Sequence, residues 1–445
     1  MPDLVIKNAR IFIDNAIQPA EIAIENGKII KVGKIIGTQE VNMVIDAKNA
    51  LILPGAIDIH VHFRDPGMTK KEDWYTGSCA AAAGGVTTVI DHPNTIPPTI
   101  DPVSFKKKQK EAKKSIIDYG INAGVTQNLN HLKNLWELGA TAFGEIFMAE
   151  STGALNVSDR TLKEALGIIE KLGAVACIHA EDEETRKSLV HHLKSASKPE
   201  YYSKSRPPLS EKIAVEKAIK MSGNTKIHFC HISAGESLEI IKKEKANNKN
   251  ITCEVAPHHL FLSTNDYKRL GTLGKMNPPL RDYYSQQELW GGLNDGTVDI
   301  IASDHAPHLE PEKMTDIWSA PAGVPGVETM MPLMLMAVKR NLITLKRLLE
   351  VACVNPAQLM GLPKGMIAQG YDADLVITGD PQQIRREKMH SKAGWTPYSG
   401  MQGIFPKMTL SRGEIVAEDG EITAKRGRGR AIPGCGFVNL KDKED

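Results

Sequence analysis

The sequence predicts an α/β fold: a (β/α)8 TIM barrel with a small β-sandwich domain formed by the N- and C-terminal segments. Two patterns predict this fold. Eight apolar, strand-like runs alternate with helix-like stretches along the middle of the chain, and short strand-like runs with turn residues occupy both ends. We therefore expect the TIM barrel over residues 54–365 and the companion β-sandwich domain over residues 1–53 and 366–445. The 445 residues suit a barrel of about 250 residues plus a smaller domain.

The terminal segments have the pattern of short strands joined by tight turns. Asn26-Gly27 lies between two apolar runs near the N-terminus, and Asp419-Gly420 occupies a similar place near the C-terminus. Both dipeptides are typical of two-residue hairpin turns. We expect the two terminal segments to pair with each other.

The middle of the chain supplies the eight strand-like runs of the barrel. They are AIDIHVHF, GVTTVID, YGINAGV, AFGEIFM, AVACIHA, KIHFCHI, ITCEVAP and DIIASDH. Most are separated by stretches of helical character, such as KEDWYTGSCAAAAGG, VSFKKKQKEAKKS, DRTLKEALGIIEKLG and ESLEIIKKEKANN. Eight strands alternating with helices are the pattern of a (β/α)8 barrel.

The composition is that of an ordinary globular protein, with 41% hydrophobic and 24% charged residues. A formal net charge of +2 gives no overall attraction to nucleic acid. The six cysteines form no CxxC pair, which argues against a disulfide framework and a thiolate zinc site. No run reaches the roughly 18 apolar residues of a membrane span, and the N-terminus lacks a signal-peptide pattern. We expect a cytoplasmic protein with no membrane partner.

Two basic clusters have simple interpretations. Lys106 to Lys114 is predicted to be the solvated face of a helix. Lys425–Arg430, which reads KRGRGR, is predicted to be a solvated tail or lid.

Ligand-type side chains fall at the carboxyl ends of the predicted barrel strands, where such barrels assemble their active sites. An HxH pair on one strand directs both imidazoles to the same face, since side-chain direction repeats every second residue. Nitrogen and oxygen donors of this kind favour one or two divalent metal ions, zinc above all. The predicted donors are His60, His62, His179, His231 and Asp304.

Several longer motifs resemble the amidohydrolase superfamily and, within it, the dihydroorotases. They are DIHVHFRDPG, GGVTTVIDHPNTIPP, CEVAPHHL, KMNPPLR, ASDHAPH, GVPGVET and NPAQLMGLPKGMIAQGYDADLVI. The resemblance covers nearly the whole chain. It implies a zinc-dependent cyclic amide hydrolase that reversibly cyclises N-carbamoyl-L-aspartate to L-dihydroorotate in de novo pyrimidine biosynthesis.

The resemblance also implies roles for the metal ligands. His60 and His62 would hold the more buried zinc together with Asp304, and His179 and His231 would hold the more exposed one. A metal-bound hydroxide would be the nucleophile. Asp304 would act as the general base and return the proton to the ring nitrogen.

Four further residues match positions at which this family holds its substrate. Arg64, Asn94 and His308 would grip the free carboxylate, for which a planar guanidinium is well suited. Asn277 would orient the pyrimidine-type ring. Asn94 and Asn277 lie beside prolines, so each also has an interpretation as a turn residue.

The chain departs from the family pattern at the fourth strand, where many relatives use a carboxylated lysine to bridge the two metals. An ungapped placement puts Glu145 at that position. We expect Glu145 to bridge two zinc ions; the alternatives are a site with one metal, a contribution from Glu150, and a salt-bridged Glu145 at the barrel rim.

His92 is a second departure, interpreted as a neutral packing histidine near the site. The polar segment from His308 to Pro325 is interpreted as a lid or a variable surface loop.

Two other functions stay open. The first is an allantoinase or hydantoinase, whose substrates lack the ring carboxylate that Arg64 and His308 would bind. The second is a catalytically silent scaffold for a transcarbamoylase, although such scaffolds typically lose metal ligands. The expected partner is a small-molecule substrate, with a homo-oligomer or a transcarbamoylase complex as further possibilities.

Overall fold

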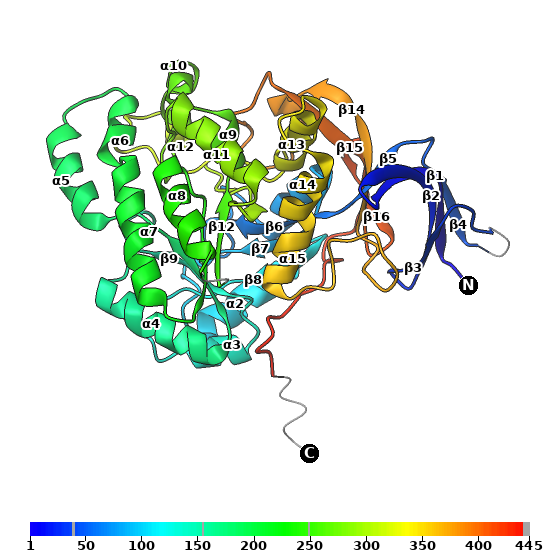
Figure 1. Cartoon of the computed structure of the whole chain (residues 1–445), viewed down its shortest axis with the longest axis horizontal. Coiled ribbons are helices and arrows are strands. Elements are labelled where there is room, and N and C mark those ends of the chain that lie inside the picture. Colours follow the sequence, from blue (N-terminus) through cyan, green and yellow to red (C-terminus); the bar gives the residue numbers. More distant parts are fainter. Residues whose placement is uncertain (38–40, 154, 248–249, 439–445) are drawn as a thin grey trace.

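The computed structural model describes residues 1–37, 41–153, 155–247 and 250–438. It has two parts that lie side by side: a barrel with its surrounding helices, and a β-rich lobe that carries the N-terminus (Figure 1). Among the described residues, no helix is both long enough and apolar enough to cross a bilayer.

Each of the eight predicted barrel runs contains a parallel strand. The first group is β6 (Ala56–Val61), β7 (Val86–Asp91) and β8 (Asp118–Ile121). The second is β9 (Phe143–Phe147), β10 (Val175–His179), β11 (Lys226–Phe229), β12 (Ile251–Val255) and β13 (Ile300–Ile301). Single bridges, Ala123 to Phe143 and Val61 to His305, join the two groups at both edges and close the ring.

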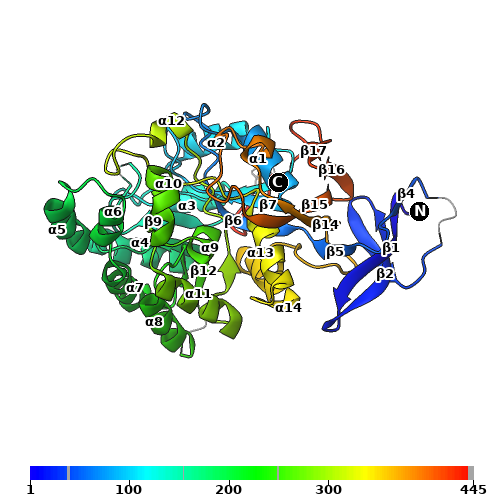
Figure 2. The ribbon, with the colours of Figure 1, turned by 90° about the horizontal axis from the view of Figure 1, so that it is seen from above.

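Helices surround this ring, as seen from above in Figure 2. The longer ones are α1 (Trp74–Ala83), α2 (Pro102–Ala112), α4 (Asp159–Leu172), α5 (Glu183–Leu193), α7 (Pro208–Ser222), α8 (Gly235–Lys245), α11 (Tyr283–Asp295) and α13 (Met330–Lys339). The shorter ones are α3 (Leu132–Glu137), α6 (Glu200–Ser205), α9 (Pro257–Phe261), α10 (Tyr267–Leu270), α12 (Glu310–Lys313), α14 (Leu345–Leu349) and α15 (Asn355–Met360).

Local sequence explains where these helices begin and end. Helix α4 begins after Ser158, whose side chain accepts from Thr161 N, and ends at Gly173 in the left-handed region (φ 68°). The four predicted helical stretches correspond to α1, α2, α4 and α8.

The β-rich lobe is one nine-stranded sheet built from both ends of the chain, as predicted. Its strands are β1 (Leu4–Ile13), β2 (Ala16–Glu25), β3 (Lys28–Gly33), β4 (Met43–Asp46), β5 (Leu51–Pro54), β14 (Leu375–Gln383), β15 (Gln402–Ser411), β16 (Glu414–Glu418) and β17 (Glu421–Ile422). Strand β5 pairs antiparallel with β14 and so joins the two ends.

Apolar side chains from both ends share the core of this lobe. Ile6, Ile22 and Ile52 pack in one cluster with Leu375 and Leu410. The predicted turns form where expected, because Asn26-Gly27 and Asp419-Gly420 all have positive φ. The exact domain boundaries, at residues 53/54 and 365/366, stay a prediction.

The interpretation of Lys106 to Lys114 as a wholly solvated face is wrong at one residue. Lys108 is fully buried, forms an ion pair with Asp91 at the end of β7 and donates to the carbonyl of His92. Its α2 neighbours Lys106 and Lys107 are exposed, as expected. The sequence did not reveal this because one lysine turns inward toward a carboxylate that the barrel itself buries.

The KRGRGR segment is also more than a solvated tail. Arg430 is exposed, but its carbonyl accepts from Tyr119 N in β8 at 3.0 Å, and Ile432 N donates back to Tyr119 O at 2.8 Å. Arg428 donates to Glu414 and to the carbonyl of Ser411. The segment therefore packs against the beginning of β8, where Ala431, the next residue, forms a single parallel bridge with Tyr119.

One buried acidic cluster joins barrel and lobe. Asp118, Asp372 and Asp374 lie close enough to share a cation, but Lys364 Nζ already lies 2.7–2.9 Å from a carboxylate oxygen of each. The lysine supplies the positive charge, so this cluster serves structure.

Candidate active site

The six predicted metal ligands converge at the carboxyl ends of the barrel strands. His60 lies in β6 and Glu145 in β9, while His179 ends β10. His62, His231 and Asp304 follow β6, β11 and β13 by one to three residues. All six side chains are buried.

Glu145 stands between two groups of histidines. Its Oε1 lies 2.7 Å from His179 Nδ1 and 2.7 Å from His231 Nε2. Its Oε2 lies 3.6 Å from His60 Nε2 and 3.9 Å from His62 Nε2. Each group, taken with Glu145, brings three possible ligand atoms within 4.8 Å of one another. The one carboxylate therefore contacts both groups of histidines.

Asp304 completes the group around His60 and His62. Its Oδ1 lies 3.2 Å from His62 Nε2 and 3.6 Å from His60 Nε2. Burial disfavours the charged form of Asp304, but the hydrogen bond from His62 and the charge of His60 outweigh it and lower the pKa of the carboxyl. Burial likewise disfavours ionised Glu145, yet hydrogen bonds from His179 and His231 hold its pKa well below the usual value.

Unusual backbone conformations hold several of these side chains in place. Arg64, His231 and Asp304 have positive φ values of 61°, 34° and 45°, which L residues seldom adopt. Gly144 has φ 147°, and a Cβ there would collide with the carbonyl of Cys177. Only glycine therefore lets β9 approach β10 closely enough to present Glu145 to His179.

Polar partners outside the cluster orient three of the histidine rings. His60 Nδ1 lies 2.5 Å from Glu254, His62 Nδ1 lies 2.6 Å from Asn94 Oδ1, and His179 Nε2 lies 2.8 Å from Glu181. With each outer oxygen accepting a ring proton, a bound metal ion would take the place of the inward hydrogen bonds to Asp304 and Glu145, and the opposite nitrogen would offer it a lone pair. The donor set thus fits a divalent metal ion. His60 Nε2, which points inward, has no hydrogen-bond partner among the described residues.

Glu181 is itself supported by a buried cation. Burial opposes its ionisation, but the charge of Arg206 and the hydrogen bond from His179 lower the pKa of Glu181 to about 2. Arg206 donates to Glu181 and also to the carbonyl of Glu150 at 2.7 Å. Glu181 therefore stays anionic at neutral pH.

Three of the four residues predicted to bind substrate line one pocket with the predicted ligands. Arg64, Asn94 and Asn277 line it together with Glu145, His179 and Asp304. His308 lies beside Arg64, with its Nε2 3.2 Å from the guanidinium. Asn277 accepts from Tyr202 and donates to Ser151. Asn94 Oδ1 lies 2.6 Å from His62 Nδ1, so this side chain contacts a predicted ligand as well as lining the pocket.

The remaining predictions near the site have clear positions. Glu150 lies outside the cluster, since its side chain is 64% exposed and pairs with Arg186.

His92 stacks on His60 at 4.0 Å, and burial together with the charges of His60 and His62 keeps its pKa well below the usual value. It is a neutral packing histidine, as interpreted.

The segment from His308 to Pro325 forms part of the pocket wall. Ala322 and Gly323 line the pocket, and Lys313 of α12 donates to the carbonyls of Lys275 and Gly323 at 2.7 Å each. Whether the segment opens and closes as a lid stays a prediction.

Sequence reasoning missed the outer partners of the ligands. Glu254 holds His60 and also receives His231 N at 3.1 Å. His258 is fully buried 4.0 Å from Asp304, and neither ring nitrogen has a hydrogen-bond partner in the described chain. The available signal was the CEVAPHHL motif itself, which places an acid within a buried barrel strand, where it needs a partner.

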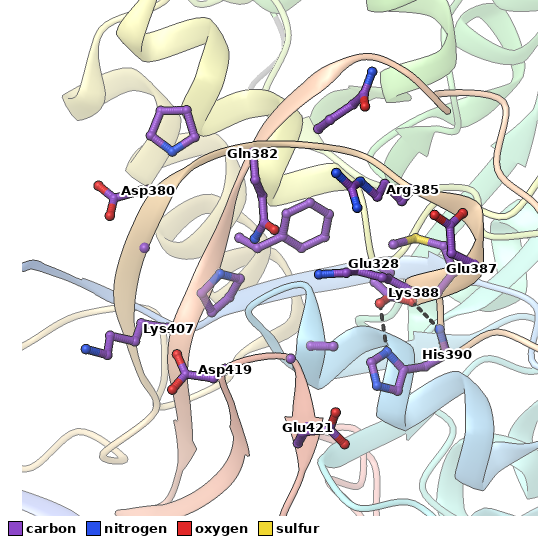
Figure 3. Close-up of a pocket in the computed structure, with 18 residues that line it drawn as sticks. Glu328, Asp380, Gln382, Arg385, Glu387, Lys388, His390, Lys407, Asp419 and Glu421 are labelled. Atoms are coloured by element: carbon purple, nitrogen blue, oxygen red, sulfur yellow. Dashed lines mark hydrogen bonds and ion pairs between the residues drawn. The ribbon is translucent and has the colours of Figure 1, made fainter.

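A larger hollow than the site pocket lies elsewhere, beside the β14–β15 hairpin and the β16–β17 turn (Figure 3). Charges of both signs rim it, including Arg385, Lys407 and Asp419. Glu328 is paired there with His390, whose Nδ1 lies 2.8 Å from the carboxylate. It contains none of the predicted ligands, so its size does not make it the active site.

Comparison with known proteins agrees with this geometry. A model described as the amidohydrolase family matches residues 51–416. The chain is 55% identical to a protein named dihydroorotase from Methanosarcina acetivorans, covering 100% of this chain and 98% of the relative. It is 40% identical to a protein of the same name from Halobacterium salinarum, over 92% and 96% of the two chains.

A solved structure extends the likeness to the fold. The L-hydantoinase (dihydropyrimidinase) from Arthrobacter aurescens superposes with a TM-score of 0.94 at 30% identity, covering 97% of this chain and 100% of that one. The predicted fold class is confirmed. With its strand-end histidines and carboxylates in the arrangement described above, the chain belongs to the amidohydrolase family.

Proposed function

We propose that this protein is a dihydroorotase, which interconverts N-carbamoyl-L-aspartate and L-dihydroorotate with release or uptake of one water. Two relatives named dihydroorotase align along nearly the full chain at 55% identity. One structural observation carries the proposal. The buried guanidinium of Arg64 lies beside His308 at the edge of the ligand cluster, where the two side chains can bind a carboxylate.

Arg64 and His308 favour substrates that carry a free carboxylate over substrates that lack one. Arg64 is only 3% exposed; burial lowers the pKa of its guanidinium to about 10 against the opposing charges of Asp304 and Asp91, so the group stays cationic at neutral pH. A buried guanidinium needs an anionic partner to offset its desolvation. The free carboxylate of carbamoyl aspartate or dihydroorotate supplies one, whereas a simple hydantoin does not.

We also propose that the cluster holds two zinc ions. His60, His62 and Asp304 would hold one and His179 and His231 the other, with Glu145 shared. The support is the donor set, because imidazole nitrogens and carboxylate oxygens suit zinc. When bound, such ions supply Lewis acidity and acidify a coordinated water.

The protein's own residues perform the proton transfer and the positioning. Asp304, kept ionised, accepts a proton from the attacking water and delivers it to the amide nitrogen as the ring opens; ring closure runs the same path backward. Arg64, His308 and Asn94 hold the carboxylate, and Asn277 orients the ring. Glu254, Glu181 and Asn94 keep the histidine rings from turning.

The decisive assay offers the purified, zinc-loaded protein four substrates separately: carbamoyl aspartate, dihydroorotate, allantoin and a 5-substituted hydantoin. We expect turnover of the first two in opposite directions. A matched variant, Arg64→Met, should raise KM for dihydroorotate without changing zinc content. Turnover of only allantoin or the hydantoin would contradict the proposal.

A hydantoinase is the second candidate, favoured by the high TM-score with the L-hydantoinase structure. A similar backbone does not decide substrate, because the pocket side chains do. The hydantoin arm of the assay tests it directly.

A catalytically silent scaffold is disfavoured because all six ligand-type residues are present and converge. Zinc analysis tests this alternative, since a metal-free native protein would support it. Association with a transcarbamoylase, self-association and a cytoplasmic location stay predictions.

A further inference from the structure

His308 is surrounded by cations on both sides of its ring. Its Nε2 lies 3.2 Å from Arg64 and 3.0 Å from the carbonyl oxygen of Ala322, while its Nδ1 lies 3.0 Å from Lys71 Nζ. Burial, together with the charges of Arg64, Lys71 and Lys313, lowers the pKa of His308. The ring is therefore neutral and carries a single proton.

The contacts identify which nitrogen carries that proton. The Lys71 ammonium can only donate, so its contact with Nδ1 is a hydrogen bond only if Nδ1 is bare. The Ala322 carbonyl can only accept, so its contact requires a proton on Nε2. Both contacts give the same tautomer.

Arg64 opposes this choice, because its guanidinium can only donate and lies 3.2 Å from Nε2, but the contacts with Lys71 and Ala322 both favour it. Glu312 is the carboxylate that faces Nδ1, but it lies 3.9 Å away, beyond hydrogen-bond distance. It lies 3.4 Å from Lys71 Nζ instead. Lys71 is therefore the group that keeps Nδ1 of His308 without a proton.

This tautomer leaves two donors side by side. Nε2–H and the Arg64 guanidinium cannot hydrogen-bond to each other, yet a carboxylate placed against them would accept from both. Arg64 and Ala322, the two neighbours of Nε2, both line the pocket that contains Asp304. A carboxylate that enters from this pocket would therefore accept from Arg64 and share the Nε2 proton that His308 now donates to the Ala322 carbonyl.

We propose that Lys71 is a positioning residue for the substrate carboxylate: by donating to His308 Nδ1, it keeps the proton on Nε2, where it acts together with Arg64. This inference rests on the proposed dihydroorotase function. Lys71 itself need not touch the substrate.

The kinetic test compares three variants of the full-length, zinc-loaded protein. Lys71→Met keeps the length of the side chain but removes the donor, and Lys71→Arg retains a cationic donor. Lys70→Met is the matched control, because Lys70 is the exposed neighbour. We expect Lys71→Met to raise KM for carbamoyl aspartate about tenfold, the usual weight of a hydrogen bond to a charged group, with kcat nearly unchanged. Lys71→Arg should restore most of the affinity, and Lys70→Met should behave as wild type.

A second readout does not depend on turnover. Nitrogen NMR of protein labelled with 15N-histidine reports which ring nitrogen carries the proton, and the His308→Gln spectrum assigns the signal of His308 by difference. We expect the Nε2–H tautomer in wild type and a mixture in Lys71→Met.

The two readouts separate the possible failures. If wild type does not turn over carbamoyl aspartate, the proposed function fails, while the NMR result still supports or overturns the Lys71–His308 contact. A raised KM with an unchanged tautomer would overturn the positioning role, as would a changed tautomer with an unchanged KM.

Discussion

Replacing Glu145 by glutamine tests the central feature of the site. The substitution preserves size and planarity but removes the negative charge that lies between the two histidine groups. Glu145 is 4% exposed, and its two oxygens face four imidazole nitrogens at 2.7–3.9 Å. No other described carboxylate has this double contact, so the loss affects both proposed metal positions.

The expected magnitude follows from that geometry. Residues that only orient a ligand change metal affinity by about 10- to 100-fold when removed, and a direct ligand should count at least as much. We expect zinc to bind at least about 100-fold more weakly at one position, a loss of about 2.8 kcal/mol. After dialysis against a chelator, zinc content should fall from two ions per chain to one or fewer, and activity should fall with it.

Elemental analysis of dialysed protein measures the zinc, and turnover of dihydroorotate measures the activity. Glu150→Gln is the matched control, because Glu150 lies in the same segment but is exposed and paired with Arg186. Circular dichroism confirms that each variant is folded. Two tightly held zinc ions in Glu145→Gln, or loss of zinc from Glu150→Gln, would refute the bridging assignment.

Three further substitutions test the remaining parts of the reasoning. Asp304→Asn should lower kcat by about 10²- to 10⁴-fold, because the amide cannot accept the proton, and retained turnover would contradict its role as base. Lys108→Met should cost about 3–5 kcal/mol in urea unfolding, since it leaves Asp91 buried and unpaired; an unchanged midpoint would mean that this ion pair adds nothing. Gly429→Ala should destabilise by about 1–3 kcal/mol, because its Cβ would collide with the Ile117 carbonyl, and a wild-type melting curve would show that the C-terminal segment is not packed there.

The strand-end histidines could be predicted because a barrel brings all carboxyl strand ends to one face. His60, His179 and His231 each follow or end an apolar run, so their convergence needed only the fold class. Glu145 needed more, because a lone glutamate in a strand gives no sign of a metal; the family resemblance supplied its alignment. Its ligand role stays a prediction that zinc analysis must test.

The outer contacts could not be predicted in the same way. Glu254 holds His60 although 194 residues separate them, and Lys71 reaches His308 across 237 residues. Such pairs depend on strand register and loop conformation, which leave no periodic signal in one sequence. The same holds for Lys108, which shares its helix with exposed lysines but turns toward Asp91.

The sequence by itself determined the fold class, the pairing of the two chain ends and the amino acids that converge at the barrel mouth. Apolar periodicity and turn residues decide these features, because they depend on local conformation and on which faces must leave water. Only the tertiary structure decided which nitrogen of each histidine faces inward, which lysines are buried and where a carboxylate can be held. These features depend on contacts of a few ångströms between residues that are far apart in the sequence. Because burial removes water from these groups, each must find a hydrogen-bond or charged partner, and the partners present decide its protonation.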